Sequence, residues 1–122
     1  MKKLLNKKGF TLMEMMIVIA IIVILIAIAV PNFNSSLNSA NEATDSANYR
    51  AAQSAGILMA QEALTDATKA DEYYYDLSSG SLQPIPDSGT VAEDHFGKSD
   101  DHDEEYIKVV VSSNGTYTIA WE

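Results

Sequence analysis

The 122-residue sequence predicts an α+β fold, in which one long N-terminal helix packs on a small C-terminal antiparallel sheet. Two observations carry this prediction. The first half of the chain is apolar and then periodic at helical spacing, and the end of the chain holds two alternating segments joined by Asn114-Gly115. A chain of this length forms one domain, and its helix needs a second layer to cover any apolar face.

Residues 10–30 contain only two polar side chains, Thr11 and Glu14, and residues 15–30 are apolar without interruption. A helix of this length extends about 31 Å, which matches the hydrocarbon core of a bilayer. Lysines occupy positions 2, 3, 7 and 8, and no acidic residue lies among them. By the positive-inside rule, the N-terminus stays in the cytoplasm. We therefore expect residues 10–30 to form a transmembrane helix.

Pro31 follows the apolar run, and we expect the helix to bend there because proline removes a backbone hydrogen bond. Beyond Pro31, apolar and small residues recur every three or four positions, which predicts a helix to about residue 64. These residues are Phe33, Leu37, Ala40, Thr44, Ala47, Ala51, Ala55 and Leu58. We expect this stripe to face the sheet and the polar face, which includes Asp45, to face solvent.

Two segments, residues 106–112 and 116–121, show the two-residue period of half-buried strands. Their apolar positions are Ile107, Val109 and Val111 in the first, and Tyr117, Ile119 and Trp121 in the second. Asn114-Gly115 between them is the dipeptide that tight hairpin turns prefer. Since a two-stranded hairpin is not stable alone, we expect a third strand over residues 82–85. Residues 65–81, with three consecutive tyrosines at 73–75, are interpreted as a connector.

Charge and composition exclude several classes of function. The chain has 8 Lys and Arg against 17 Asp and Glu, and from residue 10 onward only 4 are basic. Such an acidic body repels phosphate backbones, so no direct nucleic-acid partner is expected. The absence of cysteine excludes disulfides and thiolate metal sites. No nucleophile–base pair or phosphate-binding loop is visible, so we expect neither an enzyme nor a cofactor.

The segment 93–105 is rich in carboxylates, which are the ligands that calcium prefers. Asp100, Asp101 and Asp103 are the candidate calcium ligands. The segment lacks the glycine and the final glutamate of an EF-hand loop. A solvated acidic loop without metal is therefore the preferred interpretation.

The segment Lys7-Lys8-Gly9-Phe10-Thr11-Leu12-Met13-Glu14 resembles the class III signal of type IV prepilins and pseudopilins. That signal has a short basic leader, a glycine, and Phe-Thr-Leu-x-Glu at the start of an apolar helix. The resemblance is close over residues 1–31 and looser to about residue 60. It implies a pilin-like lollipop fold, with a leader of residues 1–9, a filament-core helix of residues 10–30 and a head of residues 31–122.

The resemblance also implies a set of site residues. A membrane prepilin peptidase and methyltransferase would cut between Gly9 and Phe10 and methylate the new Phe10 amine. Glycine suits such a cut because it leaves the backbone open to a protease. A carboxylate within a membrane costs about 2.5–3.5 kcal/mol and is usually paired. Phe10 and Glu14 are four residues apart, so we expect them to share a helix face. The family implies that Glu14 neutralises the Phe10 amine of a neighbouring subunit.

The function implied is that of a structural subunit of an extracellular type IV pilus. Before assembly it would be a single-pass protein of the cytoplasmic membrane. Its partners would be copies of itself, an assembly platform protein and an ATPase. Many pilins have a glycine midway along the membrane helix, whereas this chain has none between Phe10 and Gly56, so local melting near Pro31 is a weaker expectation.

Two alternatives remain open. The first is a pseudopilin of a type II secretion or DNA-uptake machine, which shares the same signal. The second is a secreted soluble domain with a signal peptide cut after Ala29, within Ala27-Ile28-Ala29. The apolar run is longer than the roughly 7–15 residues usual for such a signal, which favours a retained helix.

Overall fold

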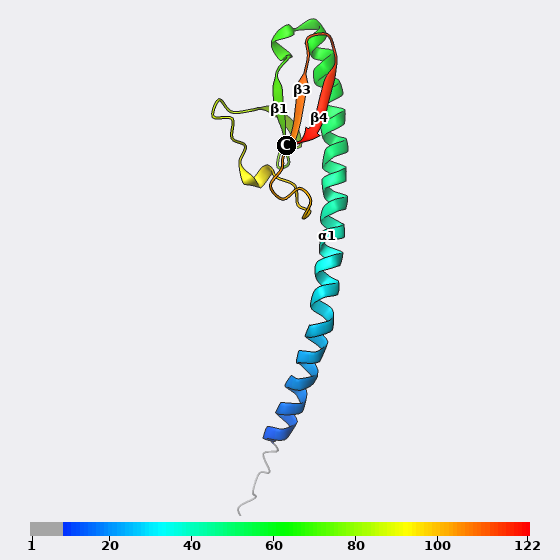
Figure 1. The fold of residues 1–122 in the computed structure, drawn as a ribbon, viewed down its shortest axis with the longest axis vertical. Coiled ribbons are helices and arrows are strands. Elements are labelled where there is room, and N and C mark those ends of the chain that lie inside the picture. Colours follow the sequence, from blue (N-terminus) through cyan, green and yellow to red (C-terminus); the bar gives the residue numbers. More distant parts are fainter. Residues whose placement is uncertain (1–8) are drawn as a thin grey trace, which may run out of the picture. The chain divides into compact units, whose positions relative to one another are not determined.

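A computed structural model describes residues 9–122 of the chain. Apart from Gly9, the predicted leader lies outside the described residues. The dominant element is α1, a single helix of 54 residues over Leu12–Thr65 (Figure 1). The predicted long helix is confirmed. The described chain divides into two structural units after Ser36.

Pro31 lies inside α1, and the chain remains helical on both sides of it. Proline cannot donate the hydrogen bond that a helical residue gives to the carbonyl one turn earlier. One residue later, the Asn32 side chain donates to the Ile28 carbonyl at 3.1 Å, which adds a polar contact to the turn before the proline. The helix therefore tolerates the proline without a break, and the bend expected there stays a prediction.

The unit Leu37–Glu122 contains a four-stranded sheet with the order β2-β1-β3-β4, in which all neighbouring strands are antiparallel. The strands are β1 Glu72–Asp76, β2 Ser81–Pro84, β3 Ile107–Val111 and β4 Tyr117–Trp121. Two short 3₁₀ turns, Ala67–Lys69 and Glu93–His95, precede β1 and β3 respectively. The predicted C-terminal hairpin and the third strand near Leu82 are confirmed.

The hairpin turn between β3 and β4 is stabilised by its own residues, Asn114 and Gly115. Gly115 has a φ of +82°, a conformation that glycine adopts without steric cost. The Asn114 side chain accepts a hydrogen bond from the Thr116 amide at 3.1 Å. A glycine in the left-handed region, beside an asparagine that bonds its own turn, thus sets the pairing of the last two strands.

Strand β1 was not predicted, because residues 65–81 were interpreted as a connector, and for residues 72–76 that interpretation is wrong. Successive side chains of a strand point to opposite faces. Tyr73 and Tyr75 are therefore buried in the core, while Tyr74 is half-buried on the other face. Tyr73 is paired with Val109 in β3 and with Pro84 in β2. Three consecutive aromatic residues are accommodated because both faces of the sheet are covered here. Tyr73 and Tyr75 share the core with alanines of α1, and Tyr74 packs against His95 on the other face.

The helix face that packs on the sheet differs from the predicted stripe. The buried residues of α1 are Asp45, Ala52, Gly56, Ala60 and Ala63. Ala51, by contrast, is exposed, and Leu58 keeps 64% of its surface. The buried face is thus displaced by one position, which is about 100° around the helix, and the predicted stripe is wrong.

Small residues occur on both candidate faces of α1, so their spacing does not tell which face packs. The deciding contact is Gly56, where an added Cβ would lie 3.0 Å from the Tyr117 ring and 3.2 Å from Val109. The helix therefore packs closely on the sheet at a position that has no side chain. The core around this contact includes Ala52, Ile107 and Val109.

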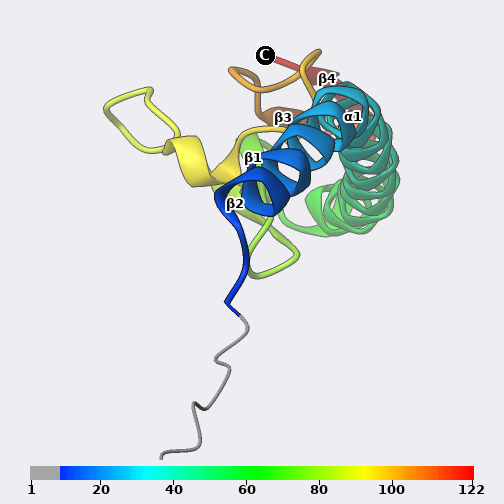
Figure 2. The same cartoon turned by 90° about the horizontal axis from the view of Figure 1, so that it is seen from below.

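The connection between β2 and β3 holds the acidic segment and the turn Glu93–His95. In both views the turn Glu93–His95 extends away from α1 (Figure 1, Figure 2). The later part of the connection returns to the helix, where Lys98 and Ser99 bond Asp45 of α1. Phe96 stacks on Tyr106 with ring centroids 6.3 Å apart, and Val91 is buried. This long connection is thus packed through a few apolar side chains.

Candidate functional site

The N-terminal site is built around the first turn of α1. The Thr11 amide donates to Glu14 Oε2 at 2.9 Å, and the Glu14 amide donates to Thr11 Oγ1 at 3.1 Å. The Met15 amide donates to the Thr11 carbonyl at 3.2 Å. Thr11 is therefore the N-cap, and Thr11 and Glu14 form a capping box, in which each side chain satisfies a backbone amide of the other residue. In the sequence, the signal of this motif is the spacing Thr-x-x-Glu.

The capping box places Gly9 and Phe10 before the helix, since α1 begins at Leu12. The expectation that Phe10 and Glu14 share a helix face is wrong, because Phe10 is not helical. Gly9 is exposed, and an added Cβ there would meet no atom within 4 Å. The packing of this chain therefore does not require a glycine at position 9. The Gly9–Phe10 bond lies in non-helical, exposed backbone, which is open to a protease.

Glu14 has a second role at the helix start. It is the acidic residue of the first turn, where a negative charge opposes the positive end of the helix dipole. Within residues 9–122, only its Oε2 atom accepts a hydrogen bond. A carboxylate has acceptor capacity on both oxygens. Glu14 can thus hold its own helix start and still receive a donor from another molecule.

The helix that follows has no partner for its apolar surface within the described residues. The large apolar side chains between Leu12 and Val30 are 40–81% exposed. This segment makes α1 long and apolar enough to cross a membrane. Exposure of so many large apolar groups to water is unfavourable. An environment outside this chain, either lipid or other helices, must therefore cover it.

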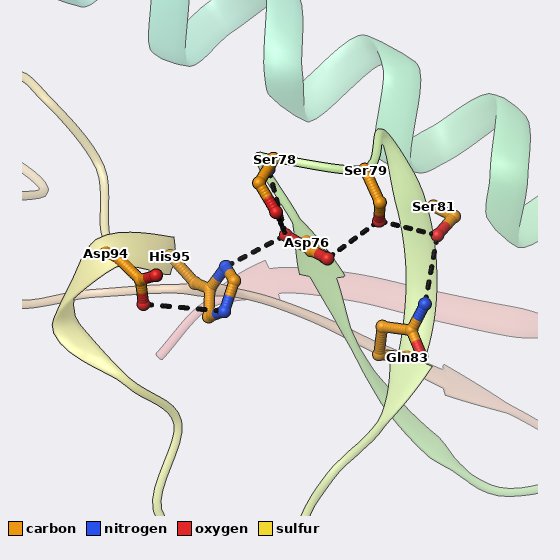
Figure 3. Close-up of polar contacts among 7 residues, drawn as sticks. All are labelled: Asp76, Ser78, Ser79, Ser81, Gln83, Asp94 and His95. Atoms are coloured by element: carbon orange, nitrogen blue, oxygen red, sulfur yellow. Dashed lines mark hydrogen bonds and ion pairs between the residues drawn. The ribbon is translucent and has the colours of Figure 1, made fainter.

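A polar cluster around Asp76 and His95 lies on the face of the sheet opposite to the buried Tyr73 and Tyr75 (Figure 3). Asp76 accepts hydrogen bonds from Ser78 Oγ at 2.6 Å and from Ser79 Oγ at 2.7 Å. His95 Nδ1 lies 3.0 Å from Asp76 Oδ1, and His95 Nε2 lies 3.5 Å from Asp94 Oδ1. The His95 ring also packs against Tyr74, with centroids 5.1 Å apart.

This cluster combines serine, histidine and aspartate, but it does not form a hydrolytic triad. Such a triad needs the serine hydroxyl to donate to the histidine. Among the residues drawn in Figure 3, both hydroxyls bonded to the aspartate donate to it, and none donates to His95. The Ser78 hydroxyl, the Ser79 hydroxyl and the Ser78 amide hold the pKa of Asp76 well below its usual range. The cluster stabilises the turn between β1 and β2 and holds the turn Glu93–His95 against the sheet.

The candidate calcium ligands Asp100, Asp101 and Asp103 are all exposed. The Asp100 amide donates to the Asn38 side chain at 3.0 Å, so this loop is held to α1 through its backbone. Within residues 9–122, no three histidine, aspartate or glutamate side chains gather in a way that could hold a metal ion. The calcium hypothesis therefore gains no support from the described geometry.

The sequence interpretation missed the role of Asp45, which was placed on the solvent face. Asp45 is only 2% exposed. Its carboxylate accepts from the Lys98 amide at 2.7 and 2.9 Å, and from the Ser99 amide and hydroxyl at 2.7 Å each. Gly97 leaves room for this arrangement, since a Cβ there would lie 3.1 Å from Asp45 Oδ2 and 2.5 Å from the His102 carbonyl oxygen. In the sequence, the only indication that Asp45 is buried is its position seven residues before Ala52. Seven residues are about two helical turns, so the two residues lie on the same face of α1.

Comparison with known proteins bears on the N-terminal site. Residues 4–30 match the family model of the prokaryotic N-terminal methylation motif. The chain therefore carries the class III signal of type IV pilins and pseudopilins, and the resemblance drawn from the sequence is confirmed. Comparisons with curated proteins and with solved structures found no match. The motif and the apolar helix together support a membrane-anchored precursor of the pilin-like or pseudopilin class.

Proposed function

We propose that this precursor is the structural subunit of an extracellular type IV pilus. A prepilin peptidase cuts between Gly9 and Phe10 on the cytoplasmic face and methylates the Phe10 amine. The helix of residues 12–30 holds the subunit in the cytoplasmic membrane until it joins the filament. The observation that carries this proposal is the capping box at Thr11 and Glu14, which begins an unpartnered apolar helix just after an exposed Gly9–Phe10 bond.

The start of the helix supports a specific assembly step. Cleavage would create a positive amine at Phe10, one residue before the N-cap. A positive charge is unfavourable there, because the helix dipole is also positive at this end. The free Oε1 atom of Glu14 in a neighbouring subunit offers a negative partner. In the low-dielectric core of a filament, an unpaired charge is unfavourable. Two opposite charges in contact attract each other strongly there.

The apolar helix supports polymerisation of the same subunits. In a membrane, lipid tails already solvate apolar side chains, so helices gain little hydrophobic energy by associating there. Packing of neighbouring helices and the Glu14–Phe10 pairing then determine the axial register. An assembly platform protein and an ATPase supply the work of extraction. The acidic heads, built from residues 31–122, coat the filament.

A pseudopilin of a type II secretion or DNA-uptake machine is the second candidate, because it uses the same signal and the same helix. The charge of the head argues against direct contact with DNA. From residue 10 onward the chain has 4 basic and 17 acidic residues. Imaging of the cell surface separates the two candidates. Long filaments that disappear when this chain is deleted support a pilus, whereas lost secretion or uptake without visible filaments supports a pseudopilus.

The first test is the intact mass and N-terminal sequence of the protein purified from its native host. We expect a chain that begins at Phe10 and is heavier by one methyl group. A start at Val30 would mean a secreted soluble domain, and the filament proposal would be abandoned. A start at Met1 in a host that has the peptidase would contradict the processing step.

A further inference from the structure

A pocket of about 520 Å³ opens in the unit Leu37–Glu122, between α1, the loop after Gly97 and the end of β4. Its size lies in the range of small-molecule sites. Helix α1 contributes a row of side chains that includes Tyr49, Arg50 and Gln53, and Trp121 comes from β4. None of its lining residues belongs to the N-terminal site.

The aromatic wall of the pocket is held in place by neighbouring groups. The His102 ring stacks on Trp121, with centroids 4.1 Å apart and planes 10° from parallel. His102 Nδ1 in turn lies 2.8 Å from Glu105 Oε2. On the helix side, the Tyr49 hydroxyl donates to the Ile119 carbonyl at 3.2 Å. The wall is thus formed before any ligand arrives, which lowers the entropy cost of binding.

The rim is held by Asp45, whose carboxylate is occupied by the amides of Lys98 and Ser99 and by the Ser99 hydroxyl. This buried charge therefore fixes the loop and does not offer a free acceptor to a ligand. The lining groups that remain available are Ser46, Arg50, Gln53 and Asp101, together with Glu42, whose Oε1 already accepts a hydrogen bond from Asn38 at 3.2 Å. Arg50 and Asp101 form no ion pair within the described residues, and both are exposed.

The available groups indicate the ligand class. Glu42 and Asp101 disfavour an anion, and Arg50 disfavours a cation. A hydroxyl group both donates and accepts, so it can bond a carboxylate, an amide or a guanidinium. A ring with apolar C–H faces can also pack on aromatic side chains. Neutral sugars combine these two properties. We propose that this pocket binds a neutral pyranose saccharide, with Gln53 and Arg50 bonding its hydroxyls beside the stacked rings of His102 and Trp121.

The test uses the fluorescence of Trp121, which is the only tryptophan in the chain. The full chain is purified in a detergent without a sugar headgroup. It is then titrated to millimolar concentrations with glucose, galactose, mannose, N-acetylglucosamine and lactose. We expect a saturable change in Trp121 emission with at least one sugar. Trilysine and inorganic phosphate are titrated in parallel as the cationic and anionic alternatives.

Two pairs of variants locate the site. Gln53→Ala should weaken saccharide binding about tenfold, as expected for one lost hydrogen bond. Gln61→Ala, on the exposed part of the same helix, should leave binding unchanged. Arg50→Ala is compared with Lys69→Ala in the same way, and circular dichroism confirms that each variant is folded. Because Arg50 is exposed, its variant tests the proposal even if Gln53→Ala does not fold.

The possible results separate clearly. Saturable binding that is weakened by Gln53→Ala or Arg50→Ala, but not by the controls, supports the proposal. The absence of saturable binding to any sugar overturns it. Equal weakening in the variants and their controls also overturns it, because the site would then lie elsewhere. Binding of trilysine or phosphate in place of sugars would show that the assigned ligand class is wrong.

Discussion

Two carboxylates on the same helix have opposite surroundings. Glu14 is exposed, and one of its oxygens is hydrogen-bonded to the Thr11 amide. Asp45 is 2% exposed, and both of its oxygens accept hydrogen bonds from the loop at Lys98 and Ser99. Both lie in segments that the sequence marks as helical. Asp45 is therefore complete within its own chain, whereas Glu14 has capacity left for a partner.

The apolar side chains repeat this contrast. From Phe10 to Ser36 they remain exposed, with Phe10 and Leu12 each 81% exposed. In the unit Leu37–Glu122, Ala52, Ile107 and Val109 are buried almost completely. The first segment thus depends on surroundings outside the chain, and the second folds around its own core. Substitutions in the first segment should affect processing and assembly, while those in the second should affect stability.

The largest expected effect is at Gly9. Gly9→Val should block cleavage, because a branched side chain at the scissile bond keeps the peptidase from the backbone. An added Cβ meets nothing within 4 Å, so the fold should not change. Mass spectrometry of membranes should show unprocessed chain, with Gly9→Ala less affected than Gly9→Val. Mature protein at the normal level in Gly9→Val would contradict this recognition.

The next effect is at Glu14, where charge and capping can be separated. Glu14→Gln keeps an amide oxygen for the Thr11 amide but removes the charge, and Glu14→Ala removes both. We expect both variants to be cleaved and both to lose filaments, as seen by electron microscopy. The exposed Glu62 provides the control, and Glu62→Gln should assemble normally. Normal filaments from Glu14→Gln alone would mean that the capping box, rather than the charge pair, controls assembly.

Within the head, the largest effect is expected at Asp45. Asp45→Ala leaves the amides of Lys98 and Ser99 without their acceptor. We expect the free energy of unfolding to fall by about 3 kcal/mol, because bonds to a buried charged group are among the strongest. Thermal unfolding followed by Trp121 fluorescence measures this change. Asp87→Ala, at an exposed position, is the control, and equal Tm values for the two variants would refute the role of Asp45.

A smaller loss is expected at Gly56. In an exposed helix, Gly→Ala stabilises by about 1 kcal/mol. Here the new Cβ would lie 3.0 Å from the Tyr117 ring, and overpacking of this kind costs about 1–3 kcal/mol. We expect a net loss of about 1 kcal/mol in the same unfolding experiment, whereas the exposed Ser54→Ala should cause none. A more stable Gly56→Ala protein would show that the helix can move away from the sheet.

The smallest effect concerns the pH dependence at Asp76. Its pKa in the folded chain is lowered by the Ser78 and Ser79 hydroxyls and the Ser78 amide. The ionised form therefore stabilises the head above the ordinary aspartate pKa of about 3.9. This contribution is lost as the pH falls toward the lower folded pKa. The Tm difference between wild type and Asp76→Asn should shrink from pH 5 to pH 2, whereas Asp87→Asn should show no such trend. A constant difference would contradict the cause assigned to the shift.

Local patterns in the sequence determined much of this protein. The apolar run from residue 10, the Gly9–Phe10 motif and the turn at Asn114-Gly115 were all readable, because each depends on neighbouring residues. The helix start was also encoded locally, in Thr11 and Glu14, although only the structure revealed the capping box. For these features, the interacting groups are at most a few residues apart in the sequence, and few other local conformations compete.

Tertiary structure alone decided which helix face is buried, that Tyr73 and Tyr75 lie in a strand, and that Asp45 is internal. Alanines line two faces of α1 with the same period, and only the contact of Gly56 with Tyr117 selects one of them. An aspartate on a helix ordinarily faces water, and only the amides of Lys98 and Ser99, more than fifty residues away, make its burial favourable. These outcomes depend on which distant segments meet, because the free energy of burying a group is set by its partners in space.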